Sequence, residues 1–322
     1  MIDESKMPIG GFFPFLSGIS LWGKGIPQNG QFFDSGRSAL WHILTLNTPK
    51  KVFIPYYLCS SVLDVFSKLN IAVEKYELNS SLMPICVPKL KSGEIFYLVN
   101  YFGLNRDFAT DLAKQLGEKL IIDDTHDLFS DPILNSWVFR NIRKSVGLPD
   151  GAILFGPLEV ELKKLQRTPF ILTPGILRRF RLNQRAWNSF KESENRFETF
   201  PHLESRLIKI FTRFIDSYNI TKIRSQNFHQ LHNFFMSRNL LSIQPFQGTP
   251  WCYPLLLSES ISRETLARHG LFIPQLWPEV SSDNQTPSWE KFLSSNLLPL
   301  PIDHRYNKSE IEKMIKIIES LI

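Results

Sequence analysis

The chain has 322 residues, of which 43% are hydrophobic and 21% charged, and its formal net charge is +6. This length and apolar content exclude a disordered chain and predict two domains or one large α/β unit with a substantial core. The basic residues are scattered, and their densest run, residues 178–181, is short. Nucleic acid is therefore only a minor possibility, and we expect no nucleic-acid partner.

The sequence also bears on the cellular location. The three cysteines, Cys59, Cys86 and Cys252, follow neither a disulfide pattern nor a metal-site spacing, which favours a reducing compartment. The N-terminus is acidic, unlike the basic start of a signal peptide. No apolar run reaches the roughly 20 residues that a membrane-spanning helix needs. We expect a cytoplasmic protein without a membrane span.

The N-terminal segment, residues 7–34, is rich in Gly, Pro and Phe, and we interpret it as a loop-like lead-in on the surface or on a partner subunit. Small and hydroxyl residues then precede an apolar-periodic stretch, which predicts a helix start near Ser35 or Gly36. Free amides at a helix start suit a phosphate, and Arg37 would add a charge-assisted contact. The alternative is an ordinary helix cap with a solvated arginine, and this segment alone favours that alternative.

Strand-like and helix-like segments alternate from there to about residue 155. The strands look apolar on both faces, which is typical of a mostly parallel sheet covered by helices. In such sheets ligands bind at the carboxyl ends of the strands. The expected strands are 51–55, 71–78, 94–100, 119–122, 136–139 and 152–155. The expected helices are one that starts near residue 35 or 36 and continues through 46, and two more at 60–69 and 107–116.

An acidic cluster, residues 123–127, follows one of these strands. Asp123 is a candidate partner for a cofactor. It is otherwise a plain loop carboxylate, or a metal ligand together with Asp124, His126 and Asp127. A metal site has little support, because the cluster is contiguous and the sequence offers no second group at ligand spacing, so we expect no metal.

Lys144 is the only lysine between Lys119 and Lys163, and it lies in a polar, glycine-bearing loop. A partly buried lysine readily loses its proton and holds an aldehyde cofactor as a Schiff base. The alternative is a solvated loop lysine, since most lysines are exposed. An anion-binding helix start, a carboxylate and a lysine in this order are the three requirements of pyridoxal 5'-phosphate, so we predict this cofactor.

Five motifs in this order resemble the DegT/StrS family of fold type I pyridoxal phosphate enzymes, which are mostly sugar aminotransferases. The similarity covers residues 30 to 155 well and continues weakly to the C-terminus. The resemblance implies a three-layer α/β large domain and a homodimer with the active site at the subunit interface. The motifs are SGRSAL at 35–40, VFIPYYLC at 52–59, YFG at 101–103, IDDTH at 122–126, and RK through PDG at 143–151.

The resemblance also implies roles for individual residues. Lys144 corresponds to the Schiff-base lysine, and Asp123 to the partner of the pyridine nitrogen. His126 stands where relatives often have a glutamine near the phenolic oxygen of the cofactor, and an imidazole donates the same hydrogen bond. The residues that would cradle the phosphate are Gly36, Arg37 and Ser38.

Some positions depart from the family pattern. Arg37 stands where many relatives have threonine, and Cys59 stands where many have an aromatic residue that stacks on the cofactor ring. Tyr57 or Tyr101 is expected to supply that surface instead. The chain is short for the family, and few residues separate the carboxylate motif from the lysine. These departures bear on substrate and activity more than on fold.

The C-terminal half is expected to form a small α+β domain, with the large domain at 1–205 and the small one at 206–322. Its histidines His229 and His232, at helical spacing, are interpreted as surface or packing residues rather than metal ligands. Arg305 beside Asp303 is interpreted as a structural ion pair. The expected helices are 192–217, 224–240, 263–270 and 309–322, and the expected strands are 249–257 and 271–274.

Taken with the resemblance, these residues predict an aminotransferase. An amino acid such as glutamate would give its amino group to a keto-sugar, typically nucleotide-linked, for surface glycan or polysaccharide synthesis. Both partners would be small molecules. Another reaction at the same cofactor imine is a second possibility, and a degenerate, non-catalytic member of the fold that binds a ligand or partner is a third.

Overall fold

The computed structural model describes residues 8–157, 165–194 and 201–322. In this part of the chain the central sheet has seven strands, which are β2 (Gln31–Phe33), β3 (Lys51–Pro55), β4 (Ala72–Tyr76), β5 (Glu94–Val99), β6 (Leu120–Asp123), β7 (Trp137–Asn141) and β8 (Ala152–Phe155). Their order in space is β2-β8-β7-β6-β5-β3-β4. All neighbours from β7 to β4 are parallel, whereas β8 runs antiparallel to β7 and β2. The predicted mostly parallel sheet is confirmed.

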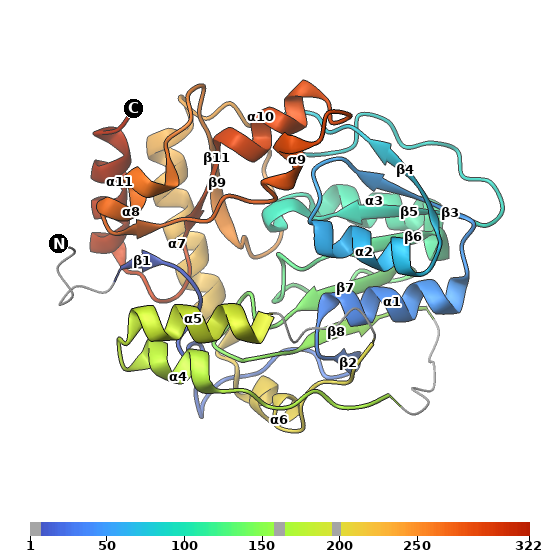
Figure 1. Cartoon of the computed structure of the whole chain (residues 1–322), viewed down its shortest axis with the longest axis horizontal. Helices are drawn as coiled ribbons and strands as arrows, with labels where there is room; N and C mark the ends of the chain where they lie inside the picture. Colours follow the sequence, from blue (N-terminus) through green and yellow to red (C-terminus); the bar gives the residue numbers. More distant parts are fainter. Residues whose placement is uncertain (1–7, 158–164, 195–200) are drawn as a thin grey trace.

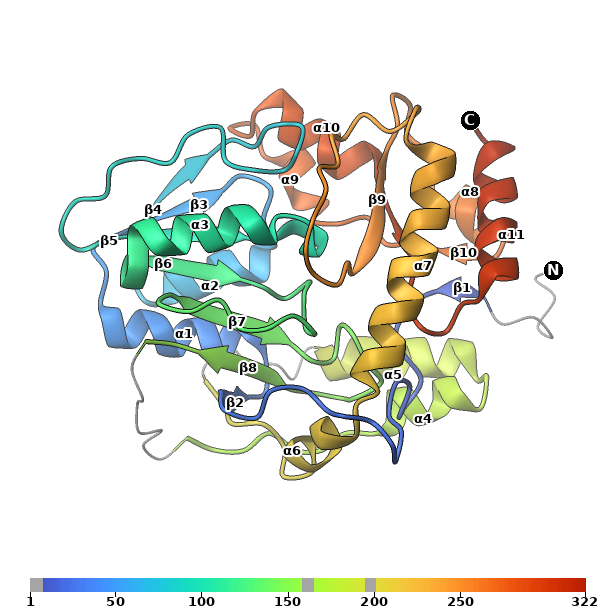
Figure 2. The ribbon, with the colours of Figure 1, turned by 180° about the vertical axis from the view of Figure 1, so that it is seen from behind.

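Helices cover both faces of this sheet, as the two opposite views show (Figures 1 and 2). Helices α1 (Gly36–Asn47) and α2 (Ser60–Lys68) lie on one face and α3 (Arg106–Leu116) on the other. The buried residues of α1 recur at helical spacing and pack on the sheet; they are Ser38, Ala39, Leu40, Ile43 and Leu44. Strands β6, β7 and β8 are buried along their whole length, as expected for strands between two helical layers.

The loop-like lead-in expected over residues 7–34 is found in residues 11–30, which form no helix or strand and expose Leu21 and Trp22, but the prediction is wrong at both ends of the segment. Strand β1 (Ile9–Gly10) pairs in parallel with β10 (Leu271–Phe272) of the C-terminal half, and β2 forms an edge of the central sheet. Phe32 and Phe33 are buried in the core. Glycine is required at Gly10, because a Cβ there would lie 2.2 Å from the main-chain oxygen of Phe272.

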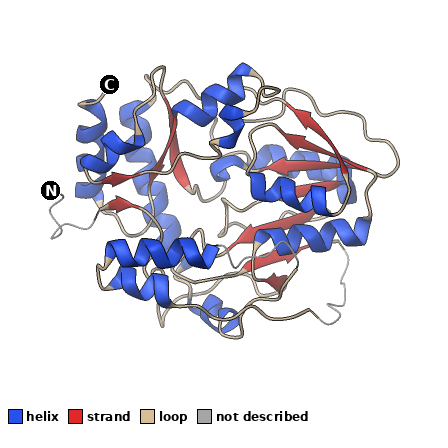
Figure 3. Ribbon diagram, viewed as in Figure 1, coloured by secondary structure: helices blue, strands red, loops and turns tan. Residues whose placement is uncertain are grey.

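The C-terminal half contains a second, two-stranded antiparallel sheet, which Figure 3 separates from the large one. It consists of β9 (Cys252–Leu256) and β11 (Leu297–Pro301). The other elements of this half are α7 (Ser217–Phe235), α8 (Arg263–Arg268), α9 (Glu279–Ser282), α10 (Ser288–Asn296) and α11 (Lys308–Glu319). The mixture of strand and helix fits the expected α+β character, while the boundary between 205 and 206 stays a prediction.

The prediction of a continuous helix over 192–217 is wrong in the described residues. Helix α5 (Asn183–Glu194) ends early in that range, residues 201–207 are not helical, and only the short α6 (Ile208–Phe211) and a 3₁₀ turn (Thr212–Phe214) follow. Residues 195–200 lie outside the described part. Pro201 disfavours a helix through this region, because proline lacks the amide that the helix needs. Helix α4 (Thr173–Arg179), packed beside α5, was not predicted.

Two further expectations concern the ion pair of Arg305 and the presence of membrane-spanning helices. Arg305 and Asp303 form a buried bidentate ion pair with a shortest distance of 2.7 Å, so the structural interpretation of Arg305 is confirmed. Among the helices of the described ranges, none combines the length and apolar character that a membrane crossing requires. Strand β1 lies beside the C-terminal helix α11 at the end of the molecule formed by the C-terminal half (Figures 1 and 2).

Candidate active site

Lys144 lies in a tight turn directly after β7, where the amides of Ser145 and Val146 both donate to the oxygen of Ile142. Asp123 is the last residue of β6, the parallel neighbour of β7, and it is in register with Phe139. The carboxyl ends of these strands meet at one edge of the sheet, which is the usual ligand-binding edge. The two side chains are close enough for the charge of each to shift the pKa of the other.

The Lys144 residue is half-buried. Burial lowers the pKa of the Lys144 ammonium, and the opposing effects of Cys59 and Asp123 do not restore it. Among the residues that the structure describes, none donates to, accepts from or forms an ion pair with this amine. This lowered pKa and partial burial favour the cofactor interpretation of Lys144 over that of a solvated loop lysine, and its role stays a prediction.

Two adjacent carboxylates of the acidic cluster have different surroundings. Asp123 accepts hydrogen bonds from the Tyr97 hydroxyl at 2.6 Å and the Thr125 amide at 3.1 Å, and burial raises the pKa of its carboxyl. Asp124 is fully buried and forms an ion pair with Arg140 at 2.8 Å. Asp124 is thus engaged in an ion pair within the fold, whereas the charge of Asp123 raises the pKa of Lys144. In the described ranges no three His, Cys, Asp or Glu side chains are grouped to hold a metal ion.

His126 lies in a stack of rings beside these groups. Its ring is 4.6 Å from that of Trp251 and 5.5 Å from that of Phe102, nearly parallel to both. The Phe102 amide donates to its Nδ1 at 3.2 Å, so the neutral ring carries its proton on Nε2. Burial, and then the charge of Lys144, lower the pKa of His126 well below its ordinary value. His126 is therefore a neutral donor through Nε2.

The start of α1 lies against the same strand ends. A Cβ on Gly36 would be 3.2 Å from the Phe139 ring and 3.9 Å from the hydroxyl of Thr125, so a larger residue here requires the Phe139 ring to shift by a few tenths of an ångström. Ser35 caps the helix, accepting from the Ser38 amide at 3.3 Å, as the sequence predicts. The Ser38 hydroxyl donates to Asp34 at 2.6 Å. The first-turn amides and the Arg37 side chain remain as the groups that an anion would meet.

The two tyrosines expected to stack on a cofactor are buried in the interior. Tyr57 and Tyr101 are stacked on each other with ring centroids 5.7 Å apart, and the Tyr101 hydroxyl donates to the main-chain oxygen of Tyr57. Trp277 packs edge-on against Tyr57 at 4.5 Å. Cys59 is half-buried at the start of α2. The role of either tyrosine toward a ring stays a prediction.

Sequence reasoning missed the contacts that hold the Lys144 turn. Trp251 donates from its indole nitrogen to the Lys144 oxygen at 2.9 Å. The buried Arg224 of α7 donates to the oxygens of Trp251 and Ser145. On the other side, Gly147 exchanges hydrogen bonds with Leu16 and Ser17 of the N-terminal segment. All these partners are distant in sequence, and no local sequence pattern predicts these contacts.

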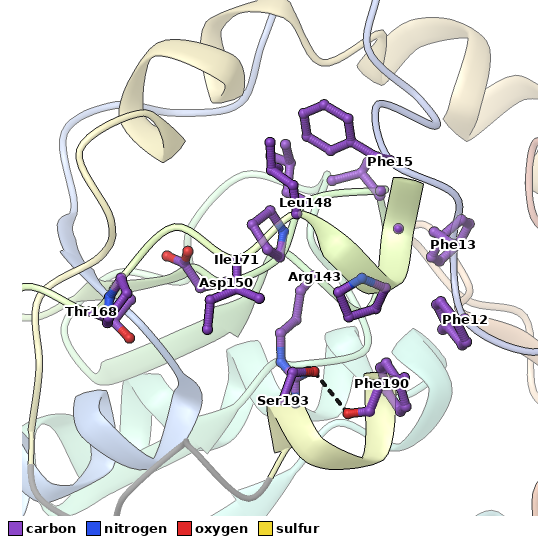
Figure 4. A pocket seen from close by; sticks show the side chains of 17 residues that line it. Phe12, Phe13, Phe15, Arg143, Leu148, Asp150, Thr168, Ile171, Phe190 and Ser193 are labelled. Atoms are coloured by element: carbon purple, nitrogen blue, oxygen red, sulfur yellow. Dashed lines mark hydrogen bonds between the residues drawn. The ribbon is translucent and has the colours of Figure 1, made fainter. Parts of the chain in front are cut away.

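A cavity of about 70 Å³ lies behind this turn, with the guanidinium of Arg143 along one wall (Figure 4). Phenylalanines from the N-terminal segment and from α5 line it together with residues of the segment 168–175. Asp150 and Ser193 add polar groups. The aromatic residues that line it are Phe12, Phe13, Phe15 and Phe190.

The fold places the chain in a known structural class. It matches a DegT DnrJ EryC1 StrS aminotransferase from Brucella abortus with a TM-score of 0.59 at 13% identity, covering 90% of this chain and 85% of that one. It matches the sugar aminotransferase CalS13 from Micromonospora echinospora with a TM-score of 0.58 at 12% identity, over 92% and 88% of the two chains. The PLP form of Spr1654 from Streptococcus pneumoniae, assigned as a sugar aminotransferase, gives 0.62 at 11% identity over 97% and 100%.

These similarities establish the fold, which is the three-layer α/β fold of the fold type I aminotransferases, as the sequence predicted. They extend over nearly the whole chain, including the C-terminal half where the sequence resemblance is weak. No protein-family model matches the sequence, and no curated protein matches it either.

Proposed function

We propose that the chain is a pyridoxal phosphate-dependent aminotransferase of the DegT/StrS family, acting on a sugar. The observation that carries this proposal is the placement of Lys144 and Asp123 at the ends of two adjacent parallel strands, where the charge of each shifts the pKa of the other. The similarity of the fold to aminotransferases supports it.

The donor set of the site fits pyridoxal phosphate. Asp123 would hold the pyridine nitrogen, and the Nε2–H of His126 would donate to the phenolic oxygen. The amides of Gly36 and Arg37, with the guanidinium of Arg37, would hold the phosphate, and Ser38 would support this helix start through its bond to Asp34. When bound, the cofactor supplies an electron-withdrawing ring that stabilises negative charge on the carbon beside the substrate nitrogen.

The residues of the chain then have distinct tasks. Because the pKa of Lys144 is lowered, its amine is available in the neutral form, both to hold the aldehyde and to move a proton at the substrate carbon. The carboxylate of Asp123 keeps a proton on the ring nitrogen. The turn around Lys144 is held from two sides, by Trp251 and by the N-terminal segment, so the amine keeps its place.

The finer parts of the proposal concern substrates and assembly. The amino donor is an amino acid such as glutamate, and the acceptor is a nucleotide-linked keto-sugar used for surface glycan or polysaccharide synthesis. The protein acts in the cytoplasm as a homodimer of two-domain subunits, with residues 1–205 as the large domain. The names of the structural neighbours support the sugar, and the family resemblance supports the rest.

The test is covalent attachment of the cofactor. Purified protein is mixed with pyridoxal phosphate, its visible absorption is recorded, and borohydride reduction is followed by mass spectrometry of the peptides. We expect a visible band and a modified Lys144 in the wild type and in Lys119→Ala, a control at an exposed lysine, but neither in Lys144→Ala. A subsequent change of the band on adding glutamate supports amino transfer. If the wild type gives no band and no adduct, the non-catalytic alternative takes the place of this proposal.

A further inference from the structure

The carboxylate of Asp123 is held from inside the sheet by a tyrosine of the neighbouring strand. Tyr97 of β5 is fully buried, and its hydroxyl donates to Oδ2 of Asp123 at 2.6 Å. Tyr97 is the one residue of the run 95–99 with a polar group in its side chain. Strands buried on both faces are usually continuous apolar runs, so a hydroxyl at this position needs a partner, and Asp123 is that partner.

The register of the two strands places this hydroxyl beneath the carboxylate. Val99 of β5 is in register with Asp123 of β6, and Tyr97, two residues earlier, faces the same side of the sheet. The Tyr97 side chain therefore approaches Asp123 from the middle of the sheet, whereas the strand ends lie on the other side of the carboxylate. The Tyr97 ring packs edge-on against Phe66 of α2 at 6.0 Å, and its main-chain oxygen accepts from the Tyr76 hydroxyl at 2.9 Å. Both the ring and the main chain of Tyr97 are thus fixed.

The two oxygens of the Asp123 carboxylate have separate partners. Oδ2 accepts from the Tyr97 hydroxyl, and Oδ1 accepts from the Thr125 amide at 3.1 Å. Two bonds to different oxygens fix the plane of the carboxylate. A carboxylate has roughly four lone-pair sites, so it can still accept from a further donor at the strand ends.

The hydroxyl also affects the charge of Asp123. Burial raises the pKa of the Asp123 carboxyl, and the hydrogen bonds from Thr125 and Tyr97 lower it. Burial, and then the charge of Asp123, raise the pKa of the Tyr97 hydroxyl well above its ordinary value, so Tyr97 keeps its proton at neutral pH and donates it. A short hydrogen bond to a carboxylate is charge-assisted and favours the ionised form.

We propose that Tyr97 is a positioning residue for the reaction, because its hydroxyl holds Asp123 ionised and in the orientation that keeps a proton on the ring nitrogen of the cofactor. This inference rests on the proposed function, and Tyr97 acts through Asp123. Without the hydroxyl, burial favours the neutral carboxyl. The proton between the two groups then passes from the ring nitrogen to the Asp123 oxygen, and the ring withdraws electrons less strongly.

The test measures the protonation of the ring nitrogen by NMR. The protein is loaded with pyridoxal phosphate labelled with ¹⁵N in the ring, because the chemical shift of this nitrogen differs between its protonated and unprotonated forms. At neutral pH we expect Tyr97→Phe to lower the ratio of protonated to unprotonated nitrogen about tenfold. Tyr76→Phe is the matched control, since it removes a buried tyrosine hydroxyl that bonds to a main-chain oxygen, and it should leave the ratio unchanged.

A second variant decides the question if Tyr97→Phe does not fold. Incorporation of 4-aminophenylalanine at position 97 preserves the shape of tyrosine but replaces the hydroxyl by a weaker donor. We expect the ratio to fall in the same direction, by a smaller factor. If the folded variants at position 97 keep the wild-type ratio, or if Tyr76→Phe lowers it equally, Tyr97 only satisfies a buried carboxylate and the inference is overturned.

Failure of the proposed function gives a different result. A wild type that forms no adduct at Lys144 contradicts that function, whereas a loaded wild type with an unaltered ratio in the variants overturns only the role of Tyr97. The cofactor-free chain tests the hydrogen bond itself. Tyr97→Phe should lower the urea midpoint less in an Asp123→Asn background than in the wild type, because a neutral amide accepts a weaker bond, and equal losses would show that the Asp123 charge gains nothing from the hydroxyl.

Discussion

The indole nitrogen of Trp251 donates a hydrogen bond to the main-chain oxygen of Lys144 at 2.9 Å, across 107 residues of sequence. The ring of the same tryptophan stacks on His126 at 4.6 Å. One side chain from the C-terminal half therefore fixes both the main chain of the candidate lysine and the plane of the candidate imidazole. Any shift of that half relative to the central sheet would therefore displace both the Lys144 main chain and the His126 ring.

Replacing this tryptophan tests how much the hydrogen bond contributes. Trp251→Phe keeps a ring against His126 but leaves the Lys144 oxygen without its donor. We expect the free energy of unfolding in urea to fall by about 1 kcal/mol and cofactor binding to weaken severalfold. The control is Trp289→Phe, because the indole nitrogen of Trp289 has no hydrogen-bond partner among the described residues. Equal effects of the two variants on cofactor binding would contradict the assignment.

Replacing each of the two adjacent aspartates by asparagine should affect a different property of the protein. Asp124→Asn breaks a buried ion pair and leaves the Arg140 charge uncompensated, which costs about 3–5 kcal/mol of stability. Asp123→Asn removes a charge that burial disfavours, so the cost in unfolding free energy should be under about 1 kcal/mol, while cofactor function is lost. Urea unfolding separates the pair, and a large stability loss in Asp123→Asn would assign Asp123 to the fold instead.

Local sequence patterns were sufficient to predict much of the fold. Strand β3 has the bounds predicted from its apolar run, and α1 begins after Ser35, one of the two predicted cap residues. Both signals depend on residues within one turn or one strand of each other. Asp123 and Lys144 were found for a related reason, since each follows a strand and parallel strands bring their ends together.

Contacts between residues that are far apart in the sequence could not be predicted from it. The ion pair of Arg143 with Glu194 and the bond of Trp251 to Lys144 depend on how helices and loops pack, which no spacing rule encodes. The strands at the two ends of the N-terminal segment were missed for the same reason. Its Gly- and Pro-rich composition indicates a loop, but Phe33 is buried against a sheet strand contributed by residues 152–155.

The depressed pKa of Lys144 has a consequence for stability. In the unfolded chain the amine has its ordinary pKa, so the folded protein binds fewer protons in the window between the two values. Folding is therefore penalised at neutral pH, and the penalty fades as the pH rises toward the ordinary lysine value. Without cofactor, Lys144→Met should have a higher Tm than the wild type at pH 7, and the difference should shrink at pH 9.5. The exposed Lys119→Met should show neither effect.

Asp150 should make stability depend on pH in the opposite sense. Burial, and the charges of Asp34 and Glu204, raise the pKa of its carboxyl to about 7, despite two hydrogen bonds from Ser205. The folded protein thus binds more protons than the unfolded chain between about pH 4 and pH 7, so the contribution of Asp150 to stability is lost as the pH rises through this range.

Asp150→Asn is uncharged and nearly isosteric, and its amide can still bond to Ser205. We expect the unfolding free energy of this variant, relative to the wild type, to rise from pH 5 to pH 8. The exposed Asp64→Asn serves as the control, with no such rise. A difference between Asp150→Asn and the wild type that stays constant with pH would mean that Asp150 is already ionised at pH 5 in the folded protein.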